Sequence, residues 1–260
     1  MLKNLRNSLL SAAAVMAVAV GVPNVAKADL FQVGFLLDSS GSITLGGWNT
    51  IKAGLSSAIA GFVGQPDQYE LSVVSFSDAT QTIINKQVVT GGNLAALQAS
   101  ILAAPFLNSF TNYQAAFNTM TSVMDPSNST ADASYINFAT DGNPNRPLGG
   151  DPFALGTAAR NAAIAAGIDN ISIEAIGTSI DATYLQGSIC YPGPCTIAPA
   201  YNFPNQGFYI AVADADAYAG AIAQKIAVIT QAPEPGSLAI LSGALLAFGA
   251  IRRRQRRNNA

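Results

Sequence analysis

The segment Asp38-Ser39-Ser40-Gly41-Ser42 follows a run of apolar residues and carries oxygen-bearing side chains at positions i, i+2 and i+4. In a turn that leaves a strand, this spacing can direct the carboxylate of Asp38 and the hydroxyls of Ser40 and Ser42 at one point. Carboxylates and hydroxyls are hard ligands that suit Mg²⁺, Mn²⁺ or Ca²⁺. The alternative is a strand-to-helix turn in which Ser42 or Thr44 caps the next helix. Taken alone, the segment is equally compatible with both interpretations.

Two further oxygen-bearing side chains stand in comparable positions. Thr111 precedes an expected helix in Phe-Thr-Asn-Tyr, where alone it is more typical of an N-cap than of a ligand. Asp141 follows an expected strand in Ala-Thr-Asp-Gly, where alone it is compatible with an ordinary turn aspartate. If the three loops meet at one edge of a sheet, they form a site of two carboxylates and three hydroxyls with room for water or a ligand: Asp38, Ser40, Ser42, Thr111 and Asp141.

The sequence lacks the residues on which several common catalytic mechanisms depend. The sequence contains no histidine, which excludes Ser-His-Asp and Cys-His catalysis and every His-ligated zinc, iron or copper site. Ser-x-x-Lys and Gly-x-Ser-x-Gly motifs are also missing. The acids beside the predicted ion, Asp38 and Asp141, are used by the ion itself and are not available as bases. We therefore expect a protein that is not an enzyme.

Apolar runs and helical periodicity alternate along the middle of the chain. Strands are predicted at 31–37, 71–76, 135–139, 171–176 and 208–212, a more polar edge strand at 81–89, and helices at 48–62, 94–102, 113–124, 153–166 and 215–229. This alternation predicts an α/β fold with a doubly wound, parallel-rich central sheet and helices on both faces. Such sheets bind ligands beyond the carboxyl ends of their strands, which is where the oxygen-bearing residues lie.

The chain resembles the von Willebrand factor type A (vWA) domain over about residues 29–231. "FLLDSSGSI" fits the DxSxS signature of that family's metal-ion-dependent adhesion site, and "INFATDGNPN" fits its strand and aspartate motif. "FTNYQAAF" resembles the threonine loop, although the usual glycines before the threonine are missing. "ISIEAIGTSID" and "FYIAVADADAYAGAIAQKI" look like the closing strands and the last helix. The resemblance implies a vWA/Rossmann-like sheet that is mostly parallel with one antiparallel edge strand.

The same resemblance implies a role for each ligand. Ser40 and Ser42 would bind a divalent cation directly, Asp38 and Asp141 directly or through water, and Thr111 when a partner is bound. Mg²⁺ is expected first, with Mn²⁺ and Ca²⁺ as alternatives. An acidic group of an extracellular protein or polysaccharide would fill the last position, as in a binding or adhesion module. The alternative is a structural component of a biofilm or exopolysaccharide matrix whose metal site only stabilises the fold.

Residues 1–28 are typical of a secretory signal peptide. Lys3 and Arg6 precede the apolar stretch 9–22, and Ala26-Lys27-Ala28 is a small-x-small cleavage site. A permanent transmembrane anchor is the alternative, but the apolar stretch falls short of the ~20 residues that a span needs. We therefore expect cleavage between Ala28 and Asp29.

Residues 232–260 contain three features in order. Pro233-Glu234-Pro235 is followed by an uncharged stretch at 236–251 and an arginine-rich tail at 252–257. This order resembles the PEP-CTERM sorting signal of Gram-negative bacteria, with a plain C-terminal membrane anchor as the alternative. The resemblance implies a short transmembrane helix that contacts the inner membrane, arginines inside, until an exosortase cuts near Pro-Glu-Pro. The protein would then reach the cell surface or the extracellular matrix.

The domain between these ends is strongly acidic. Residues 29–231 contain 5 basic and 14 acidic side chains, a net charge of about −9. This charge argues against nucleic acid or an anionic membrane as a partner of the domain. It is compatible with attraction of divalent cations, and solubility alone explains it equally well.

Cys190 and Cys195 bracket the sequence Tyr-Pro-Gly-Pro, which lets the chain turn back. In an oxidising, exported compartment we expect them to form a disulfide. A metal-binding pair is the alternative, but two thiolates without histidine or further cysteines make a poor zinc site. The cysteines belong to a long stretch, 178–207, whose tyrosines suit partner contacts, unless the disulfide serves to keep this insertion ordered.

Overall fold

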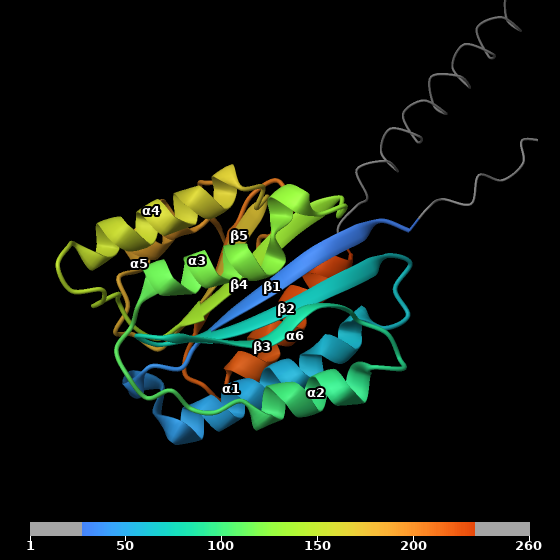
Figure 1. The fold of residues 1–260 in the computed structure, drawn as a ribbon, viewed down its shortest axis with the longest axis horizontal. Coiled ribbons are helices and arrows are strands. Elements are labelled where there is room, and N and C mark those ends of the chain that lie inside the picture. The colour runs from blue at the N-terminus through green and yellow to red at the C-terminus, as the bar shows by residue number, and fades with distance from the viewer. Residues whose placement is uncertain (1–27, 232–260) are drawn as a thin grey trace, which may run out of the picture.

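Strand β1 (Leu30–Asp38) is an inner strand of a seven-stranded sheet in the computed structural model, which describes residues 28–231 (Figure 1). The strand order is β3-β2-β1-β4-β5-β7-β6. The remaining strands are β2 (Gln68–Phe76), β3 (Thr80–Val88), β4 (Ala133–Thr140), β5 (Asn170–Ile176), β6 (Thr196–Ile197) and β7 (Phe208–Val212). Among these strands β2 and β3 pair antiparallel and all other neighbours pair parallel. The predicted α/β fold class, with its antiparallel edge strand, is confirmed.

Helices cover both faces of the sheet (Figure 1). On one face lie α1 (Thr44–Ala58), α2 (Leu94–Ala103) and α6 (Tyr218–Thr230), and on the other lie α3 (Tyr113–Met124) and α4 (Pro152–Ala165). Because side chains alternate along a strand, β1 contributes to both cores. Phe35 and Leu37 join the cluster formed with α1, α2 and α6, whereas Leu36 joins the cluster formed with α3 and α4. This burial on both faces explains why β1 is almost continuously apolar.

The chain reverses its direction of sheet growth beside β1. After β1 it forms β2 and β3 on one side, and it then crosses to β4, β5 and β7 on the other side. The position between β1 and β4 is therefore the topological switch point, where ligands of open α/β sheets bind. The strand pairs place Leu37 of β1 opposite Ala139 of β4, so Asp38 and the residues that follow β4 leave the sheet at the same edge.

Two predicted helices differ at their boundaries. The helix expected at 48–62 is divided, since α1 ends at Ala58 and the chain tightens into a 3₁₀ turn, η2 (Ile59–Phe62). The last helix begins at Tyr218 instead of residue 215. The cause is Asp214, whose carboxylate accepts a hydrogen bond of 2.9 Å from the N–H of Ala217 and holds a turn in front of the helix.

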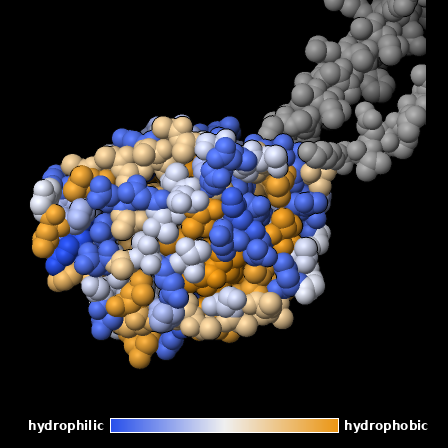
Figure 2. Space-filling view, in the orientation of Figure 1, coloured by the Kyte–Doolittle hydropathy of each residue, from blue (hydrophilic) through white to orange (hydrophobic). Residues whose placement is uncertain are grey.

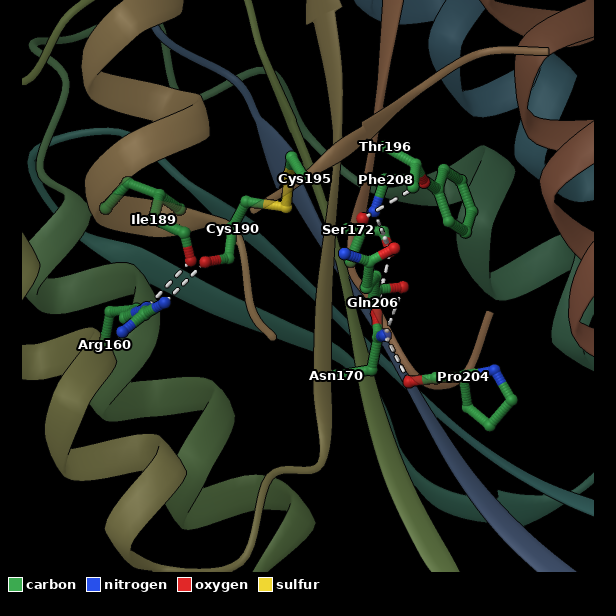
Figure 3. Close-up of a disulfide and its surroundings, with 11 residues drawn as sticks. Arg160, Asn170, Ser172, Ile189, Cys190, Cys195, Thr196, Pro204, Gln206 and Phe208 are labelled. Carbon is green, nitrogen blue, oxygen red and sulfur yellow. Dashed lines mark hydrogen bonds between the residues drawn. A yellow bond between two sulfur atoms is a disulfide. The ribbon is translucent and has the colours of Figure 1, made fainter. Parts of the chain in front are cut away.

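The insertion at 178–207 is tied to β5 and α4. It contains short elements that the sequence did not predict, namely α5 (Ala182–Tyr184), a π-helical turn η4 (Leu185–Ile189) and β6. Cys190 and Cys195 form the expected disulfide (Figure 3). Figure 3 also shows Arg160 of α4 donating to the carbonyls of Ile189 and Cys190, and Asn170 of β5 donating to those of Pro204 and Gln206. The disulfide and these hydrogen bonds hold the insertion against the domain.

A fully buried ion pair crosses from the sheet to a helix. Nζ of Lys225 in α6 lies 2.5 Å from Oε1 of Glu174 in β5, and both side chains are 0% exposed. Burial lowers the pKa of Lys225 to about 8, although the charge of Glu174 opposes the change. Burial likewise raises the pKa of Glu174, against the opposing effect of Lys225. Each charge therefore depends on the other for compensation in the core.

The two ends of the described chain lie at the same end of the molecule. β1 begins and α6 finishes at the right of Figure 1, whereas the carboxyl ends of β1 and β4 lie at the left. Within residues 28–231 no helix is both long and apolar enough to cross a membrane. The predicted sorting segment at 232–260, and the predicted signal peptide apart from Ala28, lie outside the described residues.

Candidate metal centre

Hydrogen bonds join the loops that carry the predicted ligands. The hydroxyl of Ser42 donates to Oδ1 of Asp141 over 2.7 Å, a contact between residues 99 positions apart. Oγ of Ser40 lies 3.1 Å from Oγ of Ser42, and the N–H of Ser40 donates to Oδ1 of Asp38 over 2.8 Å. The loop after β1 and the loop after β4 therefore meet, as the sequence predicts.

Thr111 belongs to the same group. A Cβ placed on Gly142 would lie 3.8 Å from Oγ of Ser42 and 4.0 Å from Oγ1 of Thr111, so both hydroxyls face the backbone directly after Asp141. The structure thus brings together all the predicted side chains, which we call the candidate metal centre: Asp38, Ser40, Ser42, Thr111 and Asp141. Their role as metal ligands remains a prediction.

Capping does not account for Ser42 or Thr111. The hydroxyl of Thr44, the first residue of α1, accepts a hydrogen bond of 3.2 Å from the N–H of Gly47, whereas the hydroxyl of Ser42 is directed to Asp141. At α3 the N-cap is Asn112, whose side chain accepts a hydrogen bond of 3.0 Å from the N–H of Ala115. The N-cap alternative for Thr111 is therefore wrong, and its hydroxyl is left for the candidate metal centre.

The backbone around Thr111 is fixed by the loop that follows β4. The N–H of Thr111 donates to Oδ1 of Asn145 over 2.9 Å, and its carbonyl accepts hydrogen bonds from the N–H groups of Asn145 and Arg146. The threonine is 4% exposed. Asn145 performs this positioning although the glycines usual before the threonine are missing. Sequence reasoning did not identify Asn145, and its only signal was its place four residues after Asp141.

Asp38 is held from a second side by Thr140, which sequence reasoning also missed. The hydroxyl of Thr140 donates to Oδ2 of Asp38 over 2.6 Å, and the hydroxyl of Tyr113 donates to the carbonyl of Gly142 over 2.5 Å. Both carboxylate oxygens of Asp38 thus have donors, and the Gly142 backbone is fixed to α3. These contacts orient the carboxylates of Asp38 and Asp141 before any ligand arrives.

The arrangement destabilises the ionised forms of Asp38 and Asp141. Asp38 is 1% exposed. Its pKa is raised to about 6, first by burial and then by the negative charge of Asp141, against the hydrogen bonds from Thr140 and Ser40. Burial also raises the pKa of Asp141, which is half-buried, although the hydrogen bond from Ser42 opposes this. A positive charge between the two carboxylates would relieve both effects.

The donor set fits a hard divalent cation. All five side chains offer oxygen, and two carboxylates balance a charge of +2. Within residues 28–231 there is no cluster of three or more His, Cys, Asp or Glu side chains that could hold a metal ion. At this centre the remaining ligands would therefore be hydroxyls. A cavity of about 290 Å³ adjoins the centre and is lined by Ser42, Ile43, Asp141, Ile176, Gly177, Thr178, Ser179, Ala213, Asp214 and Ala215. A group bound at the centre therefore has space beside it.

Comparison with known proteins gives a family and a set of similar folds. The family model of the von Willebrand factor type A domain matches residues 32–197. Proximal thread matrix protein 1 from the mussel byssus is similar with a TM-score of 0.60 and 14% identity over 78% of this chain and 49% of that chain. Another structure of that protein, with a TM-score of 0.57 and 15% identity over 77% and 49% of the two chains, is described as having a zinc-occupied MIDAS motif, the metal-ion-dependent adhesion site.

The pilus adhesin SpaC from Lactobacillus rhamnosus GG is similar with a TM-score of 0.57 and 13% identity, over 79% of this chain and 31% of that chain. This chain thus spans about half or less of these proteins, and at such low identity the likeness concerns the fold. No curated protein matched the sequence.

Proposed function

The chain belongs to the von Willebrand factor type A family, and we propose that it is a binding or adhesion module that engages an acidic partner through a divalent cation. The observation that carries this proposal is the meeting of five oxygen-bearing side chains from three loops at the switch point of the sheet. A divalent cation bound there would offer an open coordination position to a carboxylate of the partner.

The protein's own residues would prepare the site in three ways. Ser40 and Ser42 present hydroxyls at one point, and Asp38 and Asp141 supply two negative charges that balance the cation. Thr140 and the N–H of Ser40 hold the carboxylate of Asp38 in one orientation. Because hydroxyls supply the remaining ligands, the loaded site carries no net negative charge and does not repel an incoming carboxylate. Mg²⁺ is the ion we expect, with Mn²⁺ or Ca²⁺ as alternatives.

A non-enzymatic role is favoured by the composition and by the similar folds. The sequence has no histidine and no activated serine motif. The solved structures to which the chain is similar include a matrix protein and a pilus adhesin. Both kinds of protein act by binding and not by catalysis.

The placement of the chain ends suits a surface-attached module. The first described residues and the end of α6 lie at the end of the molecule opposite the candidate metal centre (Figure 1). If the signal peptide and the Pro-Glu-Pro segment direct the protein to the cell surface or the extracellular matrix, attachment through either terminus leaves the candidate metal centre facing outward. The Cys190–Cys195 disulfide is typical of such an oxidising location.

The experiment uses immobilised polyglutamate and an immobilised polyuronate as acidic probes for the purified protein. Capture of the protein in Mg²⁺, its loss in chelator and its loss in Asp141→Ala are expected. Asp78→Ala is the matched control, because Asp78 is an exposed aspartate in the loop after β2. Equal capture in Mg²⁺ and chelator would contradict the proposal.

A structural matrix component is the second candidate, favoured by the likeness to the thread matrix protein. In that case the cation would raise the unfolding temperature while neither probe captures the protein. The two measurements together distinguish a binding site from a site that only stabilises the fold.

A further inference from the structure

Exposed apolar side chains gather around the candidate metal centre. Five large hydrophobic side chains are exposed within residues 28–231, and three of them stand close in sequence to the predicted ligands, two on the loops that carry Thr111 and Asp141 and one in the first turn of α1. Leu45 follows Ser42 by three positions and is 60% exposed, Phe110 directly precedes Thr111 and is 48% exposed, and Leu148 is 79% exposed in the loop after Asp141. We call these three side chains the apolar rim. Figure 2 shows hydrophobic side chains at the left end of the molecule, where these loops lie in Figure 1.

The stability of the folded core does not account for the apolar character of the rim. Side chains that remain this exposed contribute little burial to the core, and apolar groups that gather on one surface commonly mark an interaction site. Each member of the rim also stands within seven positions of a predicted ligand. The rim therefore belongs to the segments that surround the candidate metal centre and is exposed to a partner that binds there.

Arg146 places a fixed positive charge at the same end. Its guanidinium carbon lies 3.4 Å from the centroid of the Phe110 ring, and its backbone N–H donates to the carbonyl of Thr111. Nη1 donates to the carbonyl of Asn145 over 2.9 Å, one of the five N–H groups that a guanidinium offers. The arginine is thus held over the ring of Phe110 beside the centre. Arginine and aromatic residues are both enriched at protein interfaces.

The other cations within residues 28–231 lie elsewhere. Lys52 donates to backbone carbonyls at the C-terminal end of α2, Arg160 to those of the insertion, and Lys225 pairs with Glu174. Lys86 lies on the edge strand β3. Arg146 is therefore the cation that this acidic domain presents beside its candidate metal centre, and it complements an anionic partner.

We propose that the partner is a protein segment in which a carboxylate is flanked by apolar side chains, with the apolar rim and Arg146 as specificity-determining residues. The inference rests on the proposed function for the recognition of the carboxylate and adds the chemistry of its neighbours. Leu45 and Leu148 are aliphatic and match apolar side chains better than sugar rings, which favour flat aromatic surfaces. Arg146 covers one face of Phe110, so that face is not available for stacking on a sugar.

The test uses synthetic eight-residue peptides on an array, each with a central glutamate flanked by either leucine and phenylalanine or serine and glycine. A polyuronate is the polysaccharide arm. The purified full-length protein is applied in Mg²⁺ and in chelator. We expect Mg²⁺-dependent binding to the apolar-flanked peptides at least tenfold above the serine- and glycine-flanked peptides.

Leu148→Ser and Phe110→Ser should each weaken binding to the apolar-flanked peptides by at least about fivefold, because each removes an apolar contact with the flanking side chains of the peptide. Binding to the serine- and glycine-flanked peptides should stay unchanged. Leu102→Ser is the matched control, since Leu102 is 50% exposed but lies on α2. Leu148 is the more exposed of the two substituted side chains, so its variant keeps the test valid if Phe110→Ser does not fold.

Three outcomes would overturn the inference, and they separate it from the proposed function. Equal Mg²⁺-dependent binding to both peptide classes would show that the apolar rim does not contribute to specificity, and it would leave the proposed metal-dependent binding uncontradicted. Mg²⁺-dependent binding to the polyuronate with no binding to peptides would assign a polysaccharide partner. No Mg²⁺-dependent binding to any of these carboxylates would contradict the proposed function as well.

Discussion

Replacing Asp38 by asparagine should stabilise the metal-free protein while removing its affinity for a divalent cation. The carboxylate is 1% exposed, and the charge of Asp141 acts on it. Asparagine has nearly the same shape and carries no charge. Its carbonyl can still accept the hydrogen bond from the N–H of Ser40, and its NH₂ group can donate to the hydroxyl of Thr140. That hydroxyl keeps an acceptor, because the carbonyl of Gly142 lies 3.2 Å from it.

The expected gain follows from the pKa of Asp38, which is about 6 in the fold against an ordinary 3.8. Because the pKa is higher in the fold, the unfolded chain loses its proton first, so the folded state loses stability as the pH rises between these two values. At about 1.4 kcal/mol for each pH unit, the loss amounts to about 3 kcal/mol above pH 6. Hydrogen bonds to a neutral amide are weaker than those to a carboxylate, so we expect Asp38→Asn to recover about 1–3 kcal/mol.

Urea unfolding in the presence of a chelator measures this gain. At pH 7.5 the variant should unfold at a higher urea concentration than the parent protein. At pH 5 the difference should fall by about half, because the carboxyl of Asp38 then takes up a proton in the fold. Asp78→Asn, at an exposed aspartate, is the control and should change little. A variant that is less stable than its parent at pH 7.5 would refute the view that Asp38 is held at an energetic cost for the sake of a cation.

Three other predictions concern the core, the disulfide and the C-terminus. Lys225→Met should lower the free energy of unfolding, measured with urea, by about 3–5 kcal/mol, because it leaves Glu174 buried without a counter-charge. The double variant with Glu174→Leu should recover most of that free energy. A double variant as unstable as Lys225→Met alone would show that the loss does not come from the unpaired charge of Glu174. Replacing Cys190 and Cys195 by serine should cost about 2 kcal/mol, as expected for the short loop that the disulfide closes, and free thiols in the exported protein would contradict the pairing. The intact mass of the protein from its native host should correspond to a chain without residues 236–260 if they are a sorting signal, whereas a mature species that retains them would rule out the sorting signal.

The fold class could be anticipated because the composition of the strands indicates where each lies in the sheet. β1, β4 and β5 are buried along nearly their whole length and contain runs of apolar residues, whereas β3 is more polar, as an edge strand can be. The polar residues that end β1 and β4 then fall at one edge by geometry alone. For these reasons Asp38, Ser40, Ser42 and Asp141 could be grouped before their positions were known.

Contacts between distant segments could not be anticipated in the same way. The capping of α3 by Asn112 instead of Thr111 depends on which side chain reaches the N–H of Ala115, and spacing does not decide this. The bond from Thr140 to Asp38 and the pairing of Lys225 with Glu174 join residues 102 and 51 positions apart. The short elements of the insertion at 178–207 form because they pack against β5 and α4, and they have no strong periodicity of their own.

The most direct test of the candidate metal centre is a calorimetric titration of the purified protein with Mg²⁺ and with Mn²⁺. The parent protein should bind one divalent ion, and the double variant Asp38→Ala, Asp141→Ala should bind none while its circular dichroism spectrum keeps the signature of the α/β fold. Unchanged affinity in the folded double variant would contradict the assignment of the metal to Asp38, Ser40, Ser42, Thr111 and Asp141.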